Sequence, residues 1–235
     1  MSFVKKYTKK ILLWLTRRYF QSSVQDSEIS IFSNDCWGGE IYQHLQAPYL
    51  TPFIGLAIMA PCYIKLLKRP YHYLTMLPME FVTESRYEAC NVFRKQDEYP
   101  LARIDDIEIH FLHYKTPQEA ASKWSRRIKR INWDKIYVKF DVGKDYATPE
   151  MVKHFLQLPF DRKLVIAPSH FMLEENSSIV TISNYTGDAT QVFYESIKQL
   201  DIIRWLNSGD VYEFEKFGKL KGIALSRGLW MTKLL

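Results

Sequence analysis

The strongest constraint on the fold is a regular alternation of strand-like and helix-like segments from Ile107 onward. Segments with strand character read IEIHFLHY, DKIYVKF and RKLVIAP, and helical periodicity fills the two intervals between them. Both helical segments open on Thr-Pro, at Thr116 and Thr148, and a threonine cap followed by proline in the first turn is typical of a helix start. The pattern predicts an α/β fold with helices on both faces of a layered sheet.

The last part of this pattern predicts the edge of the sheet. The strand-like segment SSIVTIS follows RKLVIAP after a connection with no helical pattern, which favours an antiparallel or edge strand and therefore a mixed sheet. One further helix is predicted for ESIKQLDIIRWLNSG, with Gly209 just past its end.

The N-terminal half is less regular. A strand is predicted near Glu28 to Ser33, and the Gly38-Gly39 pair is predicted to precede a short helix that ends before Pro48. The segment PFIGLAIMAPCYIKLLK is helical in period, but Pro61 interrupts it and predicts two pieces. MEFV is predicted to form a short strand.

The positive charge of the chain is concentrated at its N-terminus. The net charge is +6, yet residues 1–20 hold six basic residues and no acid, which leaves 26 basic against 26 acidic residues elsewhere. A nucleic-acid-binding protein normally spreads basic residues over a docking face of its fold. The neutral body therefore excludes nucleic acid as the expected partner.

Residues 1–20 are predicted to form a basic amphipathic helix ahead of a single α/β domain at 21–235. At helical spacing one face is apolar and the opposite face is basic. The apolar face holds Phe3, Val4, Tyr7, Ile11, Trp14 and Leu15, and the basic face holds Lys5, Lys6, Lys9, Lys10 and Arg17. The apolar run ILLWL is too short to span a bilayer, so this helix either binds an anionic membrane surface or packs on its own domain.

The three cysteines, Cys36, Cys62 and Cys90, are widely and unevenly spaced. No pair has zinc-ligand spacing, and an odd number makes a poor disulfide framework. We therefore expect reduced thiols, no metal site and a cytoplasmic protein, which would be peripheral on the inner face of the plasma membrane if its N-terminal helix binds lipid.

The segment NDCWGGE is the strongest candidate for a binding site. It follows a predicted strand and opens a helix, where free backbone N–H groups can meet a ligand. Asn34, Trp37, Gly38 and Gly39 are the predicted ligand-binding residues, with Glu40 able to orient hydroxyl groups. The alternative is a tight turn that caps the helix. No dinucleotide-binding or phosphate-loop motif occurs.

Catalytic residues are less well indicated, and the candidates are His113, Glu40 and Cys36. A thiol at a helix N-terminus can be a nucleophile, but a small buried side chain is the favoured interpretation of Cys36. His110 and His113 are predicted to point to opposite faces of a strand, one packed inward and the other toward the site.

Two further patterns involve charged residues. Arg127 falls on the apolar stripe of its helix with Trp124 and Ile131, so it is a candidate for a phosphate contact or a structural ion pair. Asp106 and Glu108 form an acid-x-acid pair like those that hold a metal and a nucleotide diphosphate. About three such pairs are expected by chance in this composition, so we do not assign them a metal.

Long stretches of the sequence resemble a known family. IFSNDCWGGEIYQHL, YLTPFIGL and IEIHFLHYKTPQEAASKWSRRIKRINWDKIYVKF are similar to an uncharacterised bacterial family of exopolysaccharide biosynthesis proteins, over about residues 29–171. The resemblance implies a three-layer α/β/α fold with a mixed, mostly parallel, Rossmann-like sheet, and a link to capsule or exopolysaccharide production. The family's recurring positions correspond to Asn34, Cys36, Gly38, Gly39, Tyr49, Pro52, Phe53, His110, His113, Trp124, Arg127, Asn132 and Lys139.

Two hypotheses for function follow. The first is a glycosyl- or other carbohydrate-group transferase that acts on a sugar nucleotide or lipid-linked glycan at the cytoplasmic membrane face. Under this hypothesis the cofactor is unknown, and a sugar nucleotide is the candidate co-substrate. The second is a non-catalytic membrane-associated partner of polysaccharide assembly proteins, because no strong catalytic motif is present.

Overall fold

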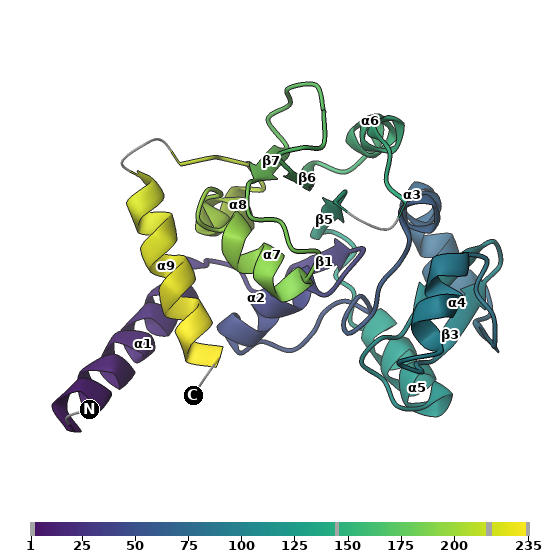
Figure 1. The fold of residues 1–235 in the computed structure, drawn as a ribbon, viewed down its shortest axis with the longest axis horizontal. Helices are drawn as coiled ribbons and strands as arrows, with labels where there is room; N and C mark the ends of the chain where they lie inside the picture. The colour runs from purple at the N-terminus through teal and green to yellow at the C-terminus, as the bar shows by residue number, and fades with distance from the viewer. Residues whose placement is uncertain (1–2, 144–145, 215–217, 234–235) are drawn as a thin grey trace.

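The computed structural model describes residues 3–143, 146–214 and 218–233, which form two sheets with helices around them (Figure 1). The strands are β1 (Ser30–Ser33), β2 (Glu80–Val82), β3 (Leu101–Ile104), β4 (Ile107–His110), β5 (Ile136–Asp141), β6 (Arg162–Pro168) and β7 (Ile179–Ile182). The helices are α1 (Phe3–Ser23), α2 (Trp37–Leu45), α3 (Ala60–Lys68), the π-helix η1 (His72–Met76), α4 (Glu88–Arg94), α5 (Pro117–Ile128), α6 (Pro149–Gln157), α7 (Ala189–Ser196), α8 (Ile202–Ser208) and α9 (Gly218–Lys233).

The main sheet has the order β1-β5-β6-β7, and all of its strand pairs are parallel. Phe32 lies opposite Val138 at one end of the sheet, and Val165 lies opposite Ile179 at the other. The predicted α/β class is confirmed. For the last strand the edge alternative is right, but β7 runs parallel to β6 rather than antiparallel.

The antiparallel strand pairs of the described residues form a second sheet, β2-β3-β4, and isolated antiparallel bridges join Ala57 to His110 and Leu200 to Glu213. Its hairpin turns at Asp105 and Asp106, with Ile104 paired to Ile107 and Asp105 in the left-handed region at φ 53°. Aspartate tolerates this conformation better than most residues. The sequence pattern indicated β2 and β4 but missed β3, and the strand predicted from Ile107 ends at His110.

Two apolar cores lie on the two faces of the main sheet, since side chains alternate along each strand. One core joins Phe32 and Val138 to α3, α5 and α6. The other joins Ile31 and Tyr137 to α2, α7 and α8. Figure 1 shows helices on both sides of the strands, so the molecule has the layered arrangement of an α/β fold.

The helix starts explain how local sequence positions these layers. Thr116 Oγ1 accepts a hydrogen bond from Glu119 N at 3.1 Å at the start of α5. Thr148 caps α6 in the same way, as predicted. The single helix expected near residue 200 is wrong, because Asp201 caps a new helix, α8, by accepting from Arg204 N at 3.1 Å.

The N-terminal helix α1 extends to Ser23, and Phe20 near its end is fully buried in the core around α2, α7 and α8. The side chains of residues 1–10 lie outside the described part, including the predicted apolar Phe3, Val4 and Tyr7 and their basic neighbours. Within the described residues no helix has the length and apolarity needed to cross a bilayer.

Candidate functional site

The glycine pair of NDCWGGE lies inside α2, so the prediction that it precedes the helix is wrong. A Cβ on Gly38 would lie 3.0 Å from Ile31 Cγ2, and the absence of a side chain therefore lets α2 pack closely on β1. At Gly39 a Cβ would meet Ile54 Cδ1 at 3.5 Å, an ordinary contact. Only the first glycine has a packing role that another residue would disturb.

The polar and aromatic side chains of the same segment face the protein interior. Asn34 is fully buried, donates to Asp141 O at 3.0 Å and accepts from Asp141 N at 2.8 Å. The Trp37 ring is fully buried, and its Nε1 donates to Ser196 Oγ at 3.2 Å. Glu40 is buried and accepts hydrogen bonds from two hydroxyl groups of α7. The expected loop with these side chains exposed to a ligand is not present, and their role in ligand binding stays untested.

These side chains surround a buried charge cluster formed by Asp35, Lys139 and Asp141. Lys139 Nζ lies 2.8 Å from Asp35 Oδ2 and 3.5 Å from Asp141 Oδ2, and all three side chains are at most 2% exposed. Asp35 Oδ1 also accepts from Trp37 N at 3.1 Å, so it satisfies a free N–H at the start of α2. The cluster ties two strand ends and a helix start together.

Asp141 is the member of the cluster with the least complete set of partners. Its Oδ1 accepts from Tyr185 OH at 2.7 Å and from Gly143 N at 2.9 Å, whereas its Oδ2 accepts no hydrogen bond from the residues that the structure describes. Burial raises the pKa of this carboxyl, although Lys139 opposes the shift. Sequence analysis named Asn34 but missed this cluster. The signal was present in the i, i+2 spacing of Lys139 and Asp141 on one strand face.

The cluster lies at the carboxyl ends of the adjacent parallel strands β1 and β5. Ligands of open α/β folds bind outside this edge of the sheet. The loop at residues 57–59 lies next to the end of β1, because Ile58 N donates to Asn34 O at 2.9 Å.

A cavity of about 640 Å³ opens next to that loop and is called here the His110 cavity. Its walls come from the 57–59 loop, α4, the two ends of the β3–β4 hairpin and the segment after β5. They comprise Ala57, Met59, Ala89, Cys90, Phe93, Tyr99, His110, Leu112 and Tyr146. The lining is mainly apolar and aromatic with few polar groups, which is the usual composition of a small-molecule site.

His110 contributes a buried imidazole to this lining. Its Nδ1 lies 3.0 Å from Tyr99 OH, and among the described residues its Nε2 has no hydrogen-bond partner. Burial lowers the pKa of His110 to about 4, against the opposing effect of Glu108, whose Oε2 lies 3.9 Å from Nε2. The imidazole is therefore neutral at pH 7.

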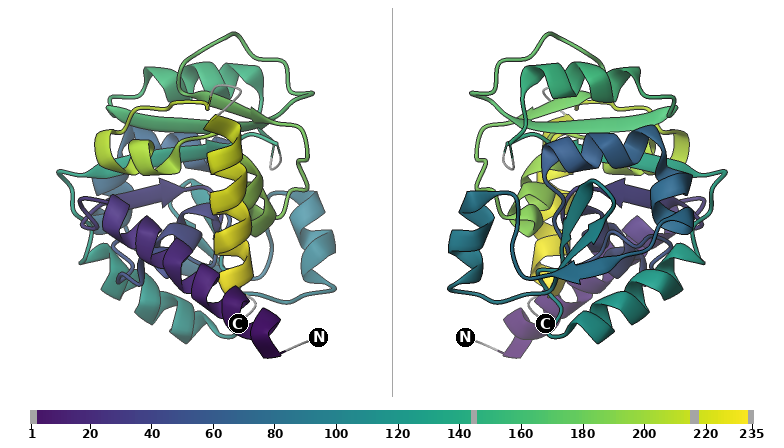
Figure 2. Two further views of the ribbon diagram at one scale, coloured as in Figure 1. Left: turned by 90° about the vertical axis from the view of Figure 1, so that its left-hand side faces the viewer. Right: turned by 90° about the vertical axis from the view of Figure 1, so that its right-hand side faces the viewer.

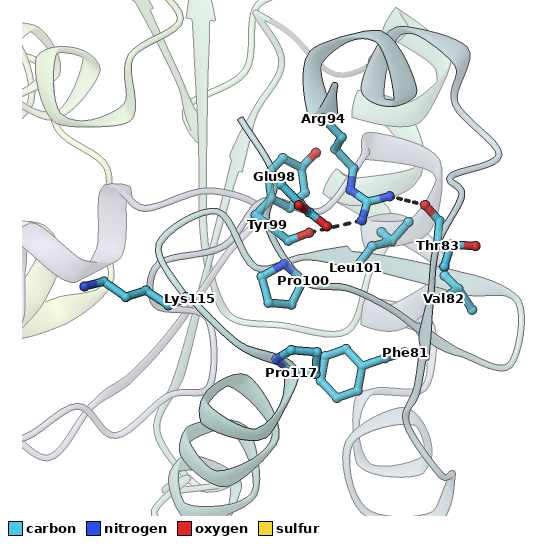
Figure 3. Close-up of a pocket in the computed structure, with 10 residues that line it drawn as sticks. All are labelled: Phe81, Val82, Thr83, Arg94, Glu98, Tyr99, Pro100, Leu101, Lys115 and Pro117. Atoms are coloured by element: carbon cyan, nitrogen blue, oxygen red, sulfur yellow. Dashed lines mark hydrogen bonds between the residues drawn. The ribbon is translucent and has the colours of Figure 1, made fainter. Parts of the chain in front are cut away.

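A second cavity, of about 440 Å³, shares Tyr99 with the first and is called here the Arg94 cavity (Figure 3). Arg94 donates through Nη2 to Tyr99 O at 3.1 Å and through Nη1 to Thr83 O at 2.5 Å. Its Nε is buried and has no hydrogen-bond partner among the described residues. Its guanidinium carbon lies 5.4 Å from the centre of the Tyr99 ring. Lys115 adds a second cation to the lining and Glu98 one carboxylate.

The catalytic candidates lie at different levels of exposure. Cys36 is partly exposed, and its Sγ lies 3.7 Å from Leu56 O. His113 is exposed beyond the end of β4, with its N–H bonded to Gly55 O at 3.0 Å. The prediction that one histidine packs inward is confirmed by His110. The catalytic roles of His113, Glu40 and Cys36 stay predictions.

Arg127 is buried, as its place on the apolar stripe predicted, but the partners found for it are neutral. Its Nη1 donates to Tyr114 OH and lies 3.4 Å from Ile54 O, and its guanidinium lies 5.0 Å from the centre of the Tyr49 ring. Arginine suits such a site because its planar group can stack and donate at once. The structure thus gives Arg127 a packing role, and a phosphate contact is untested.

The two carboxylates of the acid-x-acid pair, Asp106 and Glu108, bind different partners within the protein. Asp106 accepts from Lys65 at 2.7 Å and from Tyr73 at 2.6 Å, and these bonds lower its pKa. Burial alone would raise the pKa of Glu108, but hydrogen bonds from Ser85, Arg86 and Arg103 outweigh it and leave the pKa lowered. In the described part of the chain, no three His, Cys, Asp or Glu side chains are grouped to hold a metal ion.

Comparison with known proteins places the chain in a family. Residues 7–207 match a family described as a domain of unknown function, DUF1919, and the chain belongs to this family. It is also similar to an uncharacterised protein of Haemophilus influenzae, at 25% identity over 214 residues that cover 87% of this chain and 96% of that protein.

Proposed function

We propose that this protein is a carbohydrate-group transferase of surface polysaccharide assembly, active at the cytoplasmic membrane face, with its donor bound across the His110 and Arg94 cavities. The donor class is a sugar nucleotide or a lipid-linked glycan. The observation that carries the proposal is that an aromatic, mainly apolar cavity and a cavity lined by Arg94 share Tyr99 in their lining. The resemblance to exopolysaccharide biosynthesis proteins supports the polysaccharide context.

The His110 cavity fits the planar or ring-shaped half of such a donor. Phe93, Tyr99 and Tyr146 supply aromatic rings that can stack on a base or a sugar face. The free Nε2 of His110 can form one hydrogen bond, which would orient a hydroxyl or an amide in an otherwise apolar lining. Its volume of about 640 Å³ falls within the range of small-molecule sites.

The Arg94 cavity fits the anionic half. Arg94 and Lys115 outnumber Glu98 among the lining residues, and Figure 3 shows Arg94 at the cavity with the Lys115 side chain directed away from it. The unpartnered Nε of Arg94 is a donor that a phosphate oxygen could satisfy. Because Tyr99 borders both cavities, one ligand that passes its ring could occupy both.

Thermal shift with nucleotide sugars tests this proposal. UDP- and GDP-linked sugars should raise the melting temperature saturably, and the matching monosaccharides, which lack phosphate, should not. A ligand at a hundredfold excess over its dissociation constant stabilises the folded state by about 2.7 kcal/mol. For a domain of this size that corresponds to a rise of roughly 5–10 °C.

Two variants of α4 localise any shift. Ala89→Phe places a ring into the His110 cavity from an exposed helix position and should abolish the shift. Val92→Phe is the matched control, because Val92 is exposed on the same helix and does not line the cavity. Equal shifts in both variants would place the ligand elsewhere. Failure of every sugar nucleotide and undecaprenyl-linked sugar to bind would favour the non-catalytic partner instead.

A further inference from the structure

The two helices at one end of the molecule carry many basic residues and no acidic ones. Figure 2 shows α1 and α9 side by side at this end, and the two helices pack against each other. Together they contain 10 of the 32 Lys and Arg residues and none of the 26 Asp and Glu residues. The remainder of the chain therefore has 22 basic and 26 acidic residues, the opposite balance.

The same helices expose large apolar side chains. On α1, Ile11, Trp14, Leu15 and Tyr19 follow a helical spacing, and the Trp14 side chain is 59% exposed. On α9, Leu220 and Trp230 are also exposed. Exposed aromatic and aliphatic residues among cations are typical of a helix that lies in a membrane interface.

The two helices are built to cross closely. Gly228 of α9 faces Thr16 of α1, and a Cβ on this glycine would lie 2.5 Å from Thr16 Cγ2. On its inner side α9 is anchored to the domain through buried Leu229 and through Ser226, whose hydroxyl donates to Tyr194 O at 2.7 Å. These contacts therefore set the position of α9 relative to α1, and with it the positions of their outer sides.

A groove of about 550 Å³ runs between them. Its lining is mainly apolar and includes Leu15, Tyr19 and Leu225, and the exposed cations Lys221 and Arg227 also line it. An acyl chain would fit the apolar lining, and an anionic headgroup attached to it would fit the two cations.

We propose that α1 and α9 form one composite docking surface for an anionic lipid bilayer. Cations on both helices meet the headgroups, while Trp14 and Trp230 insert at the interface. The surface specifies the membrane contact of the proposed transferase. It rests on residues other than those of the two cavities, so lipid binding and donor binding can fail independently.

Co-sedimentation of the full chain with vesicles tests the contribution of α9. The protein should bind vesicles of phosphatidylcholine with about one third phosphatidylglycerol, bind pure phosphatidylcholine weakly, and dissociate near 1 M salt, where the screening length falls to roughly 3 Å. The double variant Lys221→Gln/Arg227→Gln should bind about thirtyfold more weakly, the factor for removing two cations from an anionic surface.

The matched control is Arg126→Gln/Lys129→Gln. It removes the same charge from exposed positions on or next to α5, at the other end of the molecule in Figure 1. The control should bind like the unmodified protein. Equal binding by both double variants would overturn the composite surface, and equal binding to neutral and anionic vesicles would overturn the lipid class.

Brominated phospholipids test the insertion of both helices. Quenching of tryptophan fluorescence should fall in Trp14→Phe and fall separately in Trp230→Phe, because each exposed indole contacts the bilayer. Quenching that depends on Trp14 alone would exclude α9 from the surface. A concentration-dependent dimer that Trp14→Ala disrupts, without vesicle binding, would assign the surface to a second copy of this chain.

Discussion

Replacing Lys139 by methionine tests whether the buried charge cluster stabilises the fold. The ammonium is fully buried and lies within 3.5 Å of carboxylate oxygens on both Asp35 and Asp141. Methionine fills a similar volume but leaves two buried carboxyls without a cation. Removal of one partner from a buried ion pair typically costs about 3–5 kcal/mol, a large part of the stability of a domain.

The cost should depend on pH in a defined direction. Burial already raises the pKa of Asp141, and loss of the cation should raise it further. A carboxyl with a raised pKa in the folded state contributes stability at low pH that is lost as pH rises from the unfolded pKa toward the folded one. Within this window each pH unit lowers the free energy of unfolding by up to about 1.4 kcal/mol per proton.

Urea unfolding of the unmodified protein and Lys139→Met at pH 5, 6 and 7 measures this slope. The double variant Lys139→Met/Asp141→Asn is the control. Its amide keeps the oxygen that accepts from Tyr185 and Gly143 and places NH₂ where Oδ2 accepts no hydrogen bond. The control should lose the extra slope. A pH-independent cost in Lys139→Met, or the same slope in the double variant, would refute the assignment of the slope to protonation of Asp141.

Other predictions concern packing, capping and thiol access. Gly38→Ala should lower the free energy of unfolding by about 1–3 kcal/mol because its Cβ meets Ile31 at 3.0 Å, whereas Gly39→Ala should be neutral or stabilising by up to about 1 kcal/mol; urea unfolding compares the two. Thr116→Ala should cost about 1 kcal/mol by removing the cap of α5, measured in the same way. With Ellman's reagent at pH 8, Cys62, which is 2% exposed, should react far more slowly than the other two cysteines.

The elements that sequence analysis predicted well are those whose signal is local. Thr116 and Thr148 each cap a helix through their own side chain, so the starts of α5 and α6 were readable from a few neighbouring residues. The single helix predicted near residue 200 failed because the cap at Asp201 interrupts a continuous apolar period. The edge strand β7 was expected, but its direction depends on how the chain returns to the sheet, which no local pattern contains.

The candidate site was harder to predict because its residues are brought together by the fold. Asn34 and Trp37 have the composition of a binding loop, yet their partners lie about 100 or more residues away, at Asp141 and Ser196. Conversely, the His110 cavity draws its walls from four separate segments, and Phe93 and Tyr146 carry no motif that links them. The polar residues of NDCWGGE made this segment a candidate binding site. Only tertiary contacts decide whether such a segment faces a ligand or the core.

Hydrogen bonds link the buried charge cluster to two walls of the His110 cavity. Through them the segment NDCWGGE can position the cavity walls without contacting a ligand. Asn34 bonds through its side chain to the backbone of Asp141 and through its carbonyl to Ile58 N. The neighbours of Ile58 line one wall of the cavity, and Tyr146, in the segment after Asp141, lines another. A shift at the cluster would therefore move two walls at once. Lys139→Met should remain folded at pH 5, and at this pH its affinity for a ligand of the His110 cavity should be lower than that of the control Gly39→Ala. Unchanged affinity in Lys139→Met would show that the cavity walls are positioned independently of the cluster.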